Sequence, residues 1–106
     1  MNLFDDRESA FENKFAHDAE LEFKAEALRN KMIAYWACEL MGRSTQDAAA
    51  YAKEIIRTDF LSAGVEEVVE KLVADLGGKA DEATVRAKMQ ACLEDARRQV
   101  GAIKTD

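Results

Sequence analysis

The chain contains no proline and only five glycines among its 106 residues. Proline interrupts helices and glycine weakens them, so their scarcity favours long, uninterrupted helices. No segment alternates apolar and polar residues as a half-buried strand does, whereas apolar residues recur at helical spacing along the chain. These absences argue against strands and predict an all-α fold.

Residues that carry most enzymatic and metal chemistry are also scarce. The sequence has one histidine, His17, and two cysteines, Cys38 and Cys92. They lack metal-site spacing, and a serine or cysteine triad would need a histidine inside the folded domain. We therefore expect a non-enzyme without metal or cofactor, whose cysteines are small, buried and reduced. A disulfide between them would require that their helices face each other.

Positive charge and long apolar runs are lacking as well. The sequence has 15 Lys and Arg residues against 21 Asp and Glu residues, which gives a net charge of −6. Such a charge repels nucleic acids and anionic membranes. No apolar run is long enough to span a bilayer, and the acidic N-terminus differs from a signal peptide. We expect a cytoplasmic protein without a nucleic-acid partner or direct membrane contact.

Four helical segments are separated by glycines, which stand at Gly42, Gly64, Gly77-Gly78 and Gly101. The first segment should form a helix over residues 18–41 that ends at Gly42. Residues suited to helix N-termini mark the starts of the others: Ser44 with Asp47, the acidic pair Glu66 and Glu67, and Asp81. Short connections make neighbouring helices pack nearly antiparallel, so residues 18–106 are expected to form a four-helix bundle.

Each segment has an apolar face that we expect to be buried. The face of the first comprises Leu21, Ala25, Leu28, Met32, Tyr35 or Trp36, and Leu40. The face of the second comprises Ala49, Ala52, Ile55, Ile56 and Phe60. The third has the clearest pattern, with Val65, Val68, Val69, Leu72, Val73 and Leu76. The fourth contributes Val85, Met89, Cys92, Ala96, Val100 and Ile103.

The N-terminal stretch concentrates aromatic residues where a chain is least constrained. Phe4, Phe11 and Phe15 fall within the first fifteen residues, and on a helix they would share one face. Ordering this stretch costs more than the burial of three rings returns, so it should not fold alone. Either it extends the first helix and packs on its own bundle, or it stays loose until a partner offers a groove. We expect residues 1–17 to be a flexible arm that becomes helical on binding.

Residues 4–42 resemble the N-terminal signature of the zeta inhibitor subunit of alphaproteobacterial F-type ATP synthases. The resemblance rests on several spaced motifs: Asp5-Asp6-Arg7-Glu8, the stretch from Phe11 to Asp18, Phe23-Lys24, Arg29-Asn30-Lys31, and the stretch from Trp36 to Gly42. It extends more loosely to the end of the chain. A match over so many positions is far more specific than any short motif.

The resemblance implies a four-helix bundle with an inhibitory arm. In this family the arm is thought to enter a catalytic alpha/beta interface of the soluble ATPase head, near the rotor, and to block ATP hydrolysis. The implied partner-binding residues are Phe4, Asp5, Asp6, Arg7, Glu8, Phe11, Glu12, Asn13, Lys14, Phe15 and His17. The phenylalanines would fill apolar pockets, while the charged residues would pair with charges of the alpha, beta and rotor subunits.

Two other functions stay open at this point. A small helical bundle could sense adenine nucleotide, although the sequence offers no phosphate-binding motif and predicts weak binding at most. A generic adaptor with an interaction arm would share every feature except the target. His17, at the junction of arm and bundle, could also make partner release depend on pH, or it could simply be an exposed residue at the start of the helix.

Overall fold

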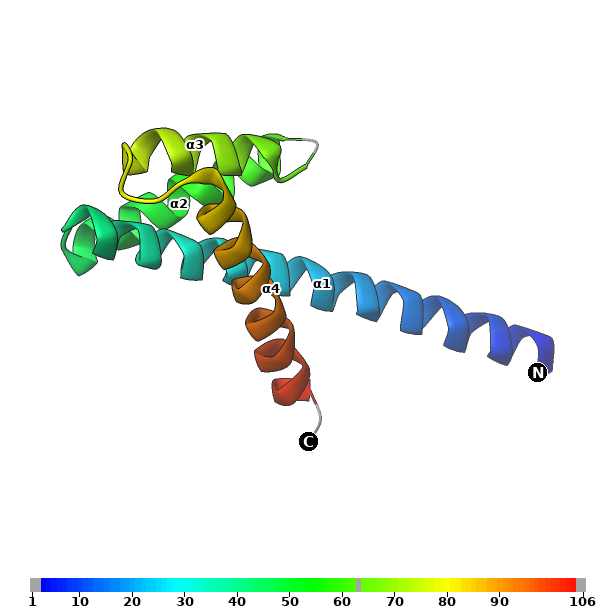
Figure 1. Cartoon of the computed structure of the whole chain (residues 1–106). Coiled ribbons are helices and arrows are strands. Elements are labelled where there is room, and N and C mark those ends of the chain that lie inside the picture. Colours follow the sequence, from blue (N-terminus) through cyan, green and yellow to red (C-terminus); the bar gives the residue numbers. More distant parts are fainter. Residues whose placement is uncertain (1–2, 63, 105–106) are drawn as a thin grey trace.

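The computed structural model describes the backbone of residues 3–62 and 64–104 and the side chains of residues 17–62 and 64–101. It contains the four helices α1 (Leu3–Met41), α2 (Thr45–Leu61), α3 (Glu66–Leu76) and α4 (Glu82–Lys104), as Figure 1 shows. The predicted all-α four-helix bundle is therefore confirmed.

Helix α1 begins at Leu3 rather than at the predicted Asp18, and it ends at the predicted Met41. The sequence between these ends contains neither proline nor glycine, so no residue interrupts the helix. At its C-terminus Gly42 adopts a left-handed conformation with φ of 72°. The N–H groups of Gly42 and Arg43 donate to the carbonyls of Glu39 and Cys38 at 3.2 and 2.9 Å. These two bonds satisfy the last carbonyls of the helix, as the predicted glycine stop requires.

The predicted N-terminal capping residues of α2 and α4 are confirmed. The Ser44 hydroxyl accepts a hydrogen bond of 3.1 Å from the Asp47 N–H at the start of α2. The Asp81 carboxylate accepts one of 2.8 Å from the Thr84 N–H at the start of α4. This bond stabilises the charged carboxylate and lowers the pKa of Asp81. Both caps satisfy backbone donors that the first turn leaves unpaired.

The core lies where α1, α2, α3 and α4 meet, and it is built largely from small and branched side chains. The predicted face of α3 is confirmed for Val68, Val69, Leu72 and Leu76, which are fully buried. It is wrong for Val65, which precedes the helix and is exposed, while Val73 is half-buried. Helix α4 contributes the buried residues Val85, Met89, Cys92 and Ala96, as predicted. Ile103 lies outside the residues whose side chains are described.

Cys38 on α1 and Cys92 on α4 are buried free thiols, which confirms the prediction of reduced core cysteines. Burial raises the pKa of both thiols because a thiolate would lose its hydration inside the core.

The predicted buried face of α2 is wrong in part. Ala52 and Ile55 are buried as expected, but Ala48 and Tyr51 join them in place of Ala49, Ile56 and Phe60, which are exposed. The helix is rotated because Tyr51 turns inward, where its hydroxyl donates a 2.7 Å hydrogen bond to the Asp75 carboxylate of α3. The Lys71 ammonium lies 3.0 Å from the same carboxylate and 5.3 Å from the centre of the Tyr51 ring. The buried face of α2 is thus centred on Tyr51 and Ile55, and a polar contact with α3 accompanies the burial of Tyr51.

The predicted face of α1 is also displaced. Ala25 is buried as predicted, but the centre of the contact is formed by Ile33, Ala34, Ala37 and Cys38. The larger predicted residues lie at its edges: Leu21, Leu28, Met32, Tyr35 and Trp36 are half-buried, and Leu40 is exposed. Small residues occupy the centre because they let the other helices approach the α1 backbone closely.

The N-terminal part of α1 projects beyond the other three helices, while α4 crosses α1 near its middle (Figure 1). The molecule measures 61 × 29 × 23 Å, and its radius of gyration is 17.3 Å. A compact domain of this length would have a radius of about 13 Å. The projecting helix accounts for the elongation. The division into an arm of residues 1–17 and a bundle of residues 18–106 stays a prediction.

Candidate partner-binding surface

The partner-binding residues predicted for the arm, other than His17, lie outside the described side chains: Phe4, Asp5, Asp6, Arg7, Glu8, Phe11, Glu12, Asn13, Lys14 and Phe15. Their contacts therefore stay predictions. Their backbone from residue 3 onward belongs to α1, so positions 4, 11 and 15 fall on one helical face. Residues 3–17 of this helix are about 22 Å long.

His17 stands where the projecting part of α1 meets the bundle. Its side chain is half-buried, and its Nε2 atom is buried without a hydrogen-bond partner among the described residues. A buried polar nitrogen without a partner is unfavourable. The predicted role of His17 in pH-dependent release stays untested.

An exposed ion pair joins α1 to α4 at the base of the arm. The Nε atom of Arg97 donates to both carboxylate oxygens of Glu22 at 3.1 and 3.2 Å, and its Nη2 atom donates to one of them. These bonds lower the pKa of Glu22 because they favour its charged form. Ala25, one turn further along α1, is fully buried. From Glu22 onward, α1 is therefore held by the bundle.

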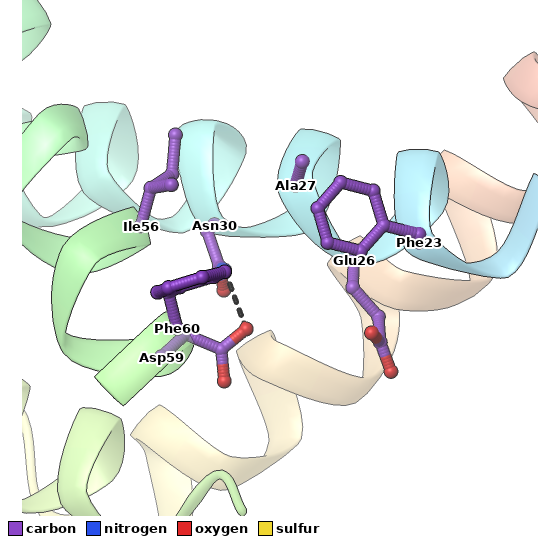
Figure 2. A pocket seen from close by; sticks show the side chains of 7 residues that line it. All are labelled: Phe23, Glu26, Ala27, Asn30, Ile56, Asp59 and Phe60. Carbon is purple, nitrogen blue, oxygen red and sulfur yellow. Dashed lines mark hydrogen bonds between the residues drawn. The ribbon is translucent and has the colours of Figure 1, made fainter. Parts of the chain in front are cut away.

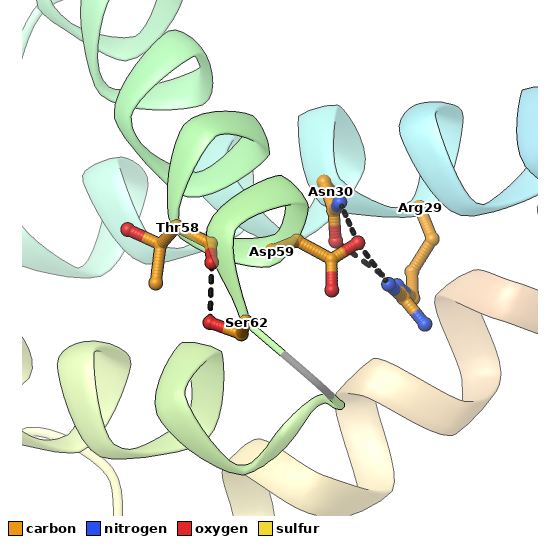
Figure 3. Close-up of polar contacts among 5 residues, drawn as sticks. All are labelled: Arg29, Asn30, Thr58, Asp59 and Ser62. Atoms are coloured by element: carbon orange, nitrogen blue, oxygen red, sulfur yellow. Dashed lines mark hydrogen bonds and ion pairs between the residues drawn. The ribbon is translucent and has the colours of Figure 1, made fainter.

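A polar network joins α1 to the end of α2 (Figure 3). The Asp59 carboxylate accepts hydrogen bonds from the Arg29 guanidinium at 3.2 Å and from the Asn30 amide at 2.9 Å. The Nε atom of Arg29 also donates to the side-chain amide oxygen Oδ1 of Asn30 at 3.0 Å. Arg29 and Asn30 are only 4% and 2% exposed. This network was not predicted, because its members are some thirty residues apart in sequence.

The residues after Asp59 close the end of α2. The Ser62 N–H donates to the Asp59 carbonyl at 3.2 Å, and the Ser62 hydroxyl donates to the Thr58 carbonyl (Figure 3). Thr58 in turn donates its hydroxyl to the Glu54 carbonyl at 2.9 Å. These bonds satisfy carbonyls at the helix C-terminus and hold Asp59 in place beside α1.

A shallow groove with a cavity of about 50 Å³ runs between α1 and α2, which we call the α1–α2 groove. It is lined by Phe23, Glu26, Ala27, Asn30, Ile56, Asp59 and Phe60, and Figure 2 shows these side chains on the two helices. Phe23 is 63% exposed and Phe60 is 78% exposed. Exposed aromatic side chains beside a groove are typical of protein contact surfaces.

A second hollow, of about 410 Å³, lies between α1, α3 and α4. Its volume is within the range of small-molecule sites. Three arginines line it, and each already binds a carboxylate: Arg29 binds Asp59, Arg86 binds Glu66 at 2.8 Å, and Arg97 binds Glu22. Their positive charge is therefore largely neutralised within the protein.

Membrane-spanning helices and metal-binding clusters were also sought in the described residues. Within the part of the chain that the structure describes, no helix is both long enough and apolar enough to cross a membrane. Over the same residues, no cluster of three or more His, Cys, Asp or Glu side chains could bind a metal ion.

Comparison with known proteins gives a match to a protein family and matches to solved structures. The sequence model of the family described as ATPase inhibitor subunit zeta matches residues 1–99. A solved structure, described as a solution NMR structure, is 44% identical in sequence and superposes with a TM-score of 0.71. The match covers 77% of this chain and 96% of that one. No curated protein matches the chain.

Proposed function

Because the chain belongs to the ATPase inhibitor subunit zeta family, we propose that its arm, residues 1–17, inserts into a catalytic alpha/beta interface of the F-type ATP synthase head and blocks ATP hydrolysis. The family match covers the arm as well as the bundle, and it assigns the chain a regulatory role as an inhibitor. The observation that carries the proposal is the projection of the N-terminal part of α1 beyond the bundle (Figure 1).

The proposed mechanism is that of a wedge. A catalytic interface has to change its conformation during each turnover, and a ligand shifts such an equilibrium only if it prefers one conformation. In its helical form the arm is about 22 Å long; it fits an interface that is open by the width of a helix, and it is excluded when the interface closes. Binding of the arm therefore holds the interface in one state, and hydrolysis stops.

The roles of the arm residues follow from their chemistry. Phe4, Phe11 and Phe15 share one helical face and would fill apolar pockets, each stabilising the complex by about 1.5–3 kcal/mol. Arg7 and Lys14 would pair with carboxylates of the head. At an interface without such carboxylates, the charges of Arg7 and Lys14 would be buried without a partner, which is unfavourable. These pairs would therefore mainly select the correct interface.

The bundle would act as the fixed base of the arm. The Glu22–Arg97 ion pair and the network of Arg29, Asn30 and Asp59 hold α1 from residue 22 onward. A helix anchored at its base has less freedom to lose on binding than a free peptide has. We infer that the protein is a regulatory subunit rather than an enzyme, and that it acts in the cytoplasm on the head of the membrane-bound synthase.

The proposal is tested with the full chain in which Phe4, Phe11 and Phe15 are replaced together by serine. These residues lie outside the bundle, so its unfolding midpoint should stay unchanged. The concentration that inhibits half of the ATPase activity of the purified head should rise at least about 100-fold, since several kcal/mol of contact are lost. A matched control is Leu61→Ser, which changes an exposed apolar residue of α2 outside the α1–α2 groove. Equal inhibition by both variants would contradict the role of the arm.

Adenine-nucleotide sensing is the second candidate. The hollow between α1, α3 and α4 has the volume of a ligand site, which favours it, but its arginines are already paired. A sensor would bind ATP or ADP saturably and leave the ATPase activity of the head unchanged.

A further inference from the structure

The α1–α2 groove is bordered by apolar side chains that are largely exposed to solvent. Phe60 of α2 and Phe23 of α1 are mostly exposed, and Ile56 lies beside them with part of its surface in solvent (Figure 2). None of the three belongs to the core of the bundle. Packing within the bundle does not account for these side chains, and their exposure indicates a contact surface for a partner.

The groove lies on α1 close to the base of the arm. Positions 11, 15, 19, 23 and 27 are Phe, Phe, Ala, Phe and Ala, and each is four residues from the next along the single helix α1. Positions at this spacing form one ridge that winds slowly around the helix, by about 40° at each step, so the ridge links the arm to the groove without placing them on the same face. Phe23 follows His17, the last residue of the arm, by six residues, which is about 9 Å of helix. A protein that encloses the arm up to its base would therefore meet the groove at the point where the arm enters.

Unpaired positive charge flanks the groove, although the chain as a whole is acidic. Lys31 is four residues after Ala27, Lys53 is three before Ile56, and Arg57 is three before Phe60, so each is about one helical turn from a residue of the groove. Within residues 17–62 and 64–101 these three exposed cations form no ion pair, in contrast to Lys24, Arg86 and Arg97.

The acidic residues of the groove do not neutralise these cations. The Asp59 carboxylate is occupied by Arg29 and Asn30, as Figure 3 shows. Glu26 forms no ion pair with these cations among the described residues, and its charge acts instead on Arg97 of α4, with which it lines the second hollow. A partner surface with carboxylates around an apolar ridge would complement the groove in both shape and charge.

We propose that the α1–α2 groove is a second contact surface for the ATPase head that binds the arm, and that it receives an apolar ridge of the head bordered by carboxylates. The inference rests on the proposed function, because it takes the same partner. The arm would decide which interface is occupied, and the groove would slow dissociation by holding the bundle against the rim of the head.

The test compares groove variants of the full chain with matched controls on the same helices. Phe23→Ala and Phe60→Ala remove groove side chains, while Leu40→Ala and Leu61→Ala remove exposed apolar side chains outside the groove. Each groove variant should raise the half-inhibitory concentration at least about tenfold, as expected for an aromatic contact residue. Each control should change it less than about twofold. All four residues are exposed, and thermal unfolding checks that each variant is folded.

Charge reversal gives an independent measurement that leaves the apolar surface unchanged. Lys53→Glu with Arg57→Glu should raise the half-inhibitory concentration several-fold and reduce its dependence on salt concentration. Lys79→Glu with Lys88→Glu is the control, since these cations also form no ion pair among the described residues but lie on the α3–α4 loop and on α4, neither of which lines the groove. Similar effects of both pairs would show a general charge effect and would overturn the role of the groove.

The outcomes separate the two proposals. If the arm variant with Phe4, Phe11 and Phe15 replaced loses inhibition while Phe23→Ala and Phe60→Ala inhibit like their controls, the groove contact is overturned and the arm mechanism stands. If the unchanged chain does not inhibit the head, both are overturned. If the free chain sediments as a dimer that Phe60→Ala dissociates, the groove binds a second copy, and the inference is wrong.

Discussion

Replacing Asp59 with alanine removes the only carboxylate that Arg29 and Asn30 contact among the described residues. The side chains of Arg29 and Asn30 are almost fully buried, and Asp59 itself is 21% exposed. Removal of one partner from a buried ion pair costs about 3–5 kcal/mol, and the partial exposure of Asp59 lowers this to about 2–4 kcal/mol. An acidic residue near the C-terminus of a helix is unfavourable by about 0.3–1 kcal/mol, which offsets a small part of the loss.

The loss is measured by urea and thermal unfolding followed by circular dichroism. For a domain of this size about 1 kcal/mol corresponds to 4–8 °C, so Asp59→Ala should lower Tm by roughly 10–30 °C. Asp95→Ala is the matched control: Asp95 binds Arg98 at 2.9 Å on the surface of α4, and its loss should cost less than about 1 kcal/mol. If the two variants were equally stable, the network would not hold α1 against α2, and the argument for a fixed arm base would fail.

Three more predictions concern the bundle, and one concerns the alternative function. Tyr51→Phe should lose about 1–2 kcal/mol because the Asp75 carboxylate loses its 2.7 Å hydrogen bond, whereas Tyr35→Phe should be neutral in the same urea experiment. Burial favours the neutral carboxyl of Asp75, but hydrogen bonds from Tyr51 and Lys71 outweigh this effect and lower the pKa of Asp75. The charged carboxylate therefore stabilises the fold at pH values above 3.8, the ordinary pKa of an aspartate. The stability advantage of the wild type over Asp75→Asn should therefore be complete at pH 7 and decline as the pH falls below about 4; an advantage that grows in acid would refute this sign. Because burial raises the thiol pKa of Cys38 and Cys92, both should react slowly with a thiol reagent at pH 7 and rapidly in urea, and fast reaction of the folded chain would show an open core. Titration with ATP and ADP, followed by the fluorescence of half-buried Trp36, should show no tight saturable binding, and such binding without inhibition of the head would favour the nucleotide sensor.

Local signals in the sequence predicted the helix ends well. Ser44, Asp81 and Gly42 act through hydrogen bonds or backbone angles within a few residues, so their roles do not depend on the rest of the fold. The start of α1 was wrong, since no residue between Leu3 and Met41 interrupts a helix and no local signal marks a boundary at Asp18.

Features that depend on contacts between helices could not be predicted. The buried face of α2 is centred on Tyr51, which bonds to Asp75 on another helix, and Phe60 was wrongly assigned to the core. Arg29 and Asn30 form part of a recognisable family motif, but only the position of Asp59 reveals their structural role. The contacts of the arm depend on a second molecule, and for that reason they stay proposals.

The most direct test of the account is the ATPase activity of the purified head measured with the intact chain and with a chain that lacks residues 1–17. Circular dichroism and urea unfolding of both chains establish that the bundle of the shortened chain is folded. We predict that the intact chain inhibits hydrolysis at saturation and that the folded shortened chain does not. Equal inhibition by the two chains would contradict the central claim that the arm is the inhibitor.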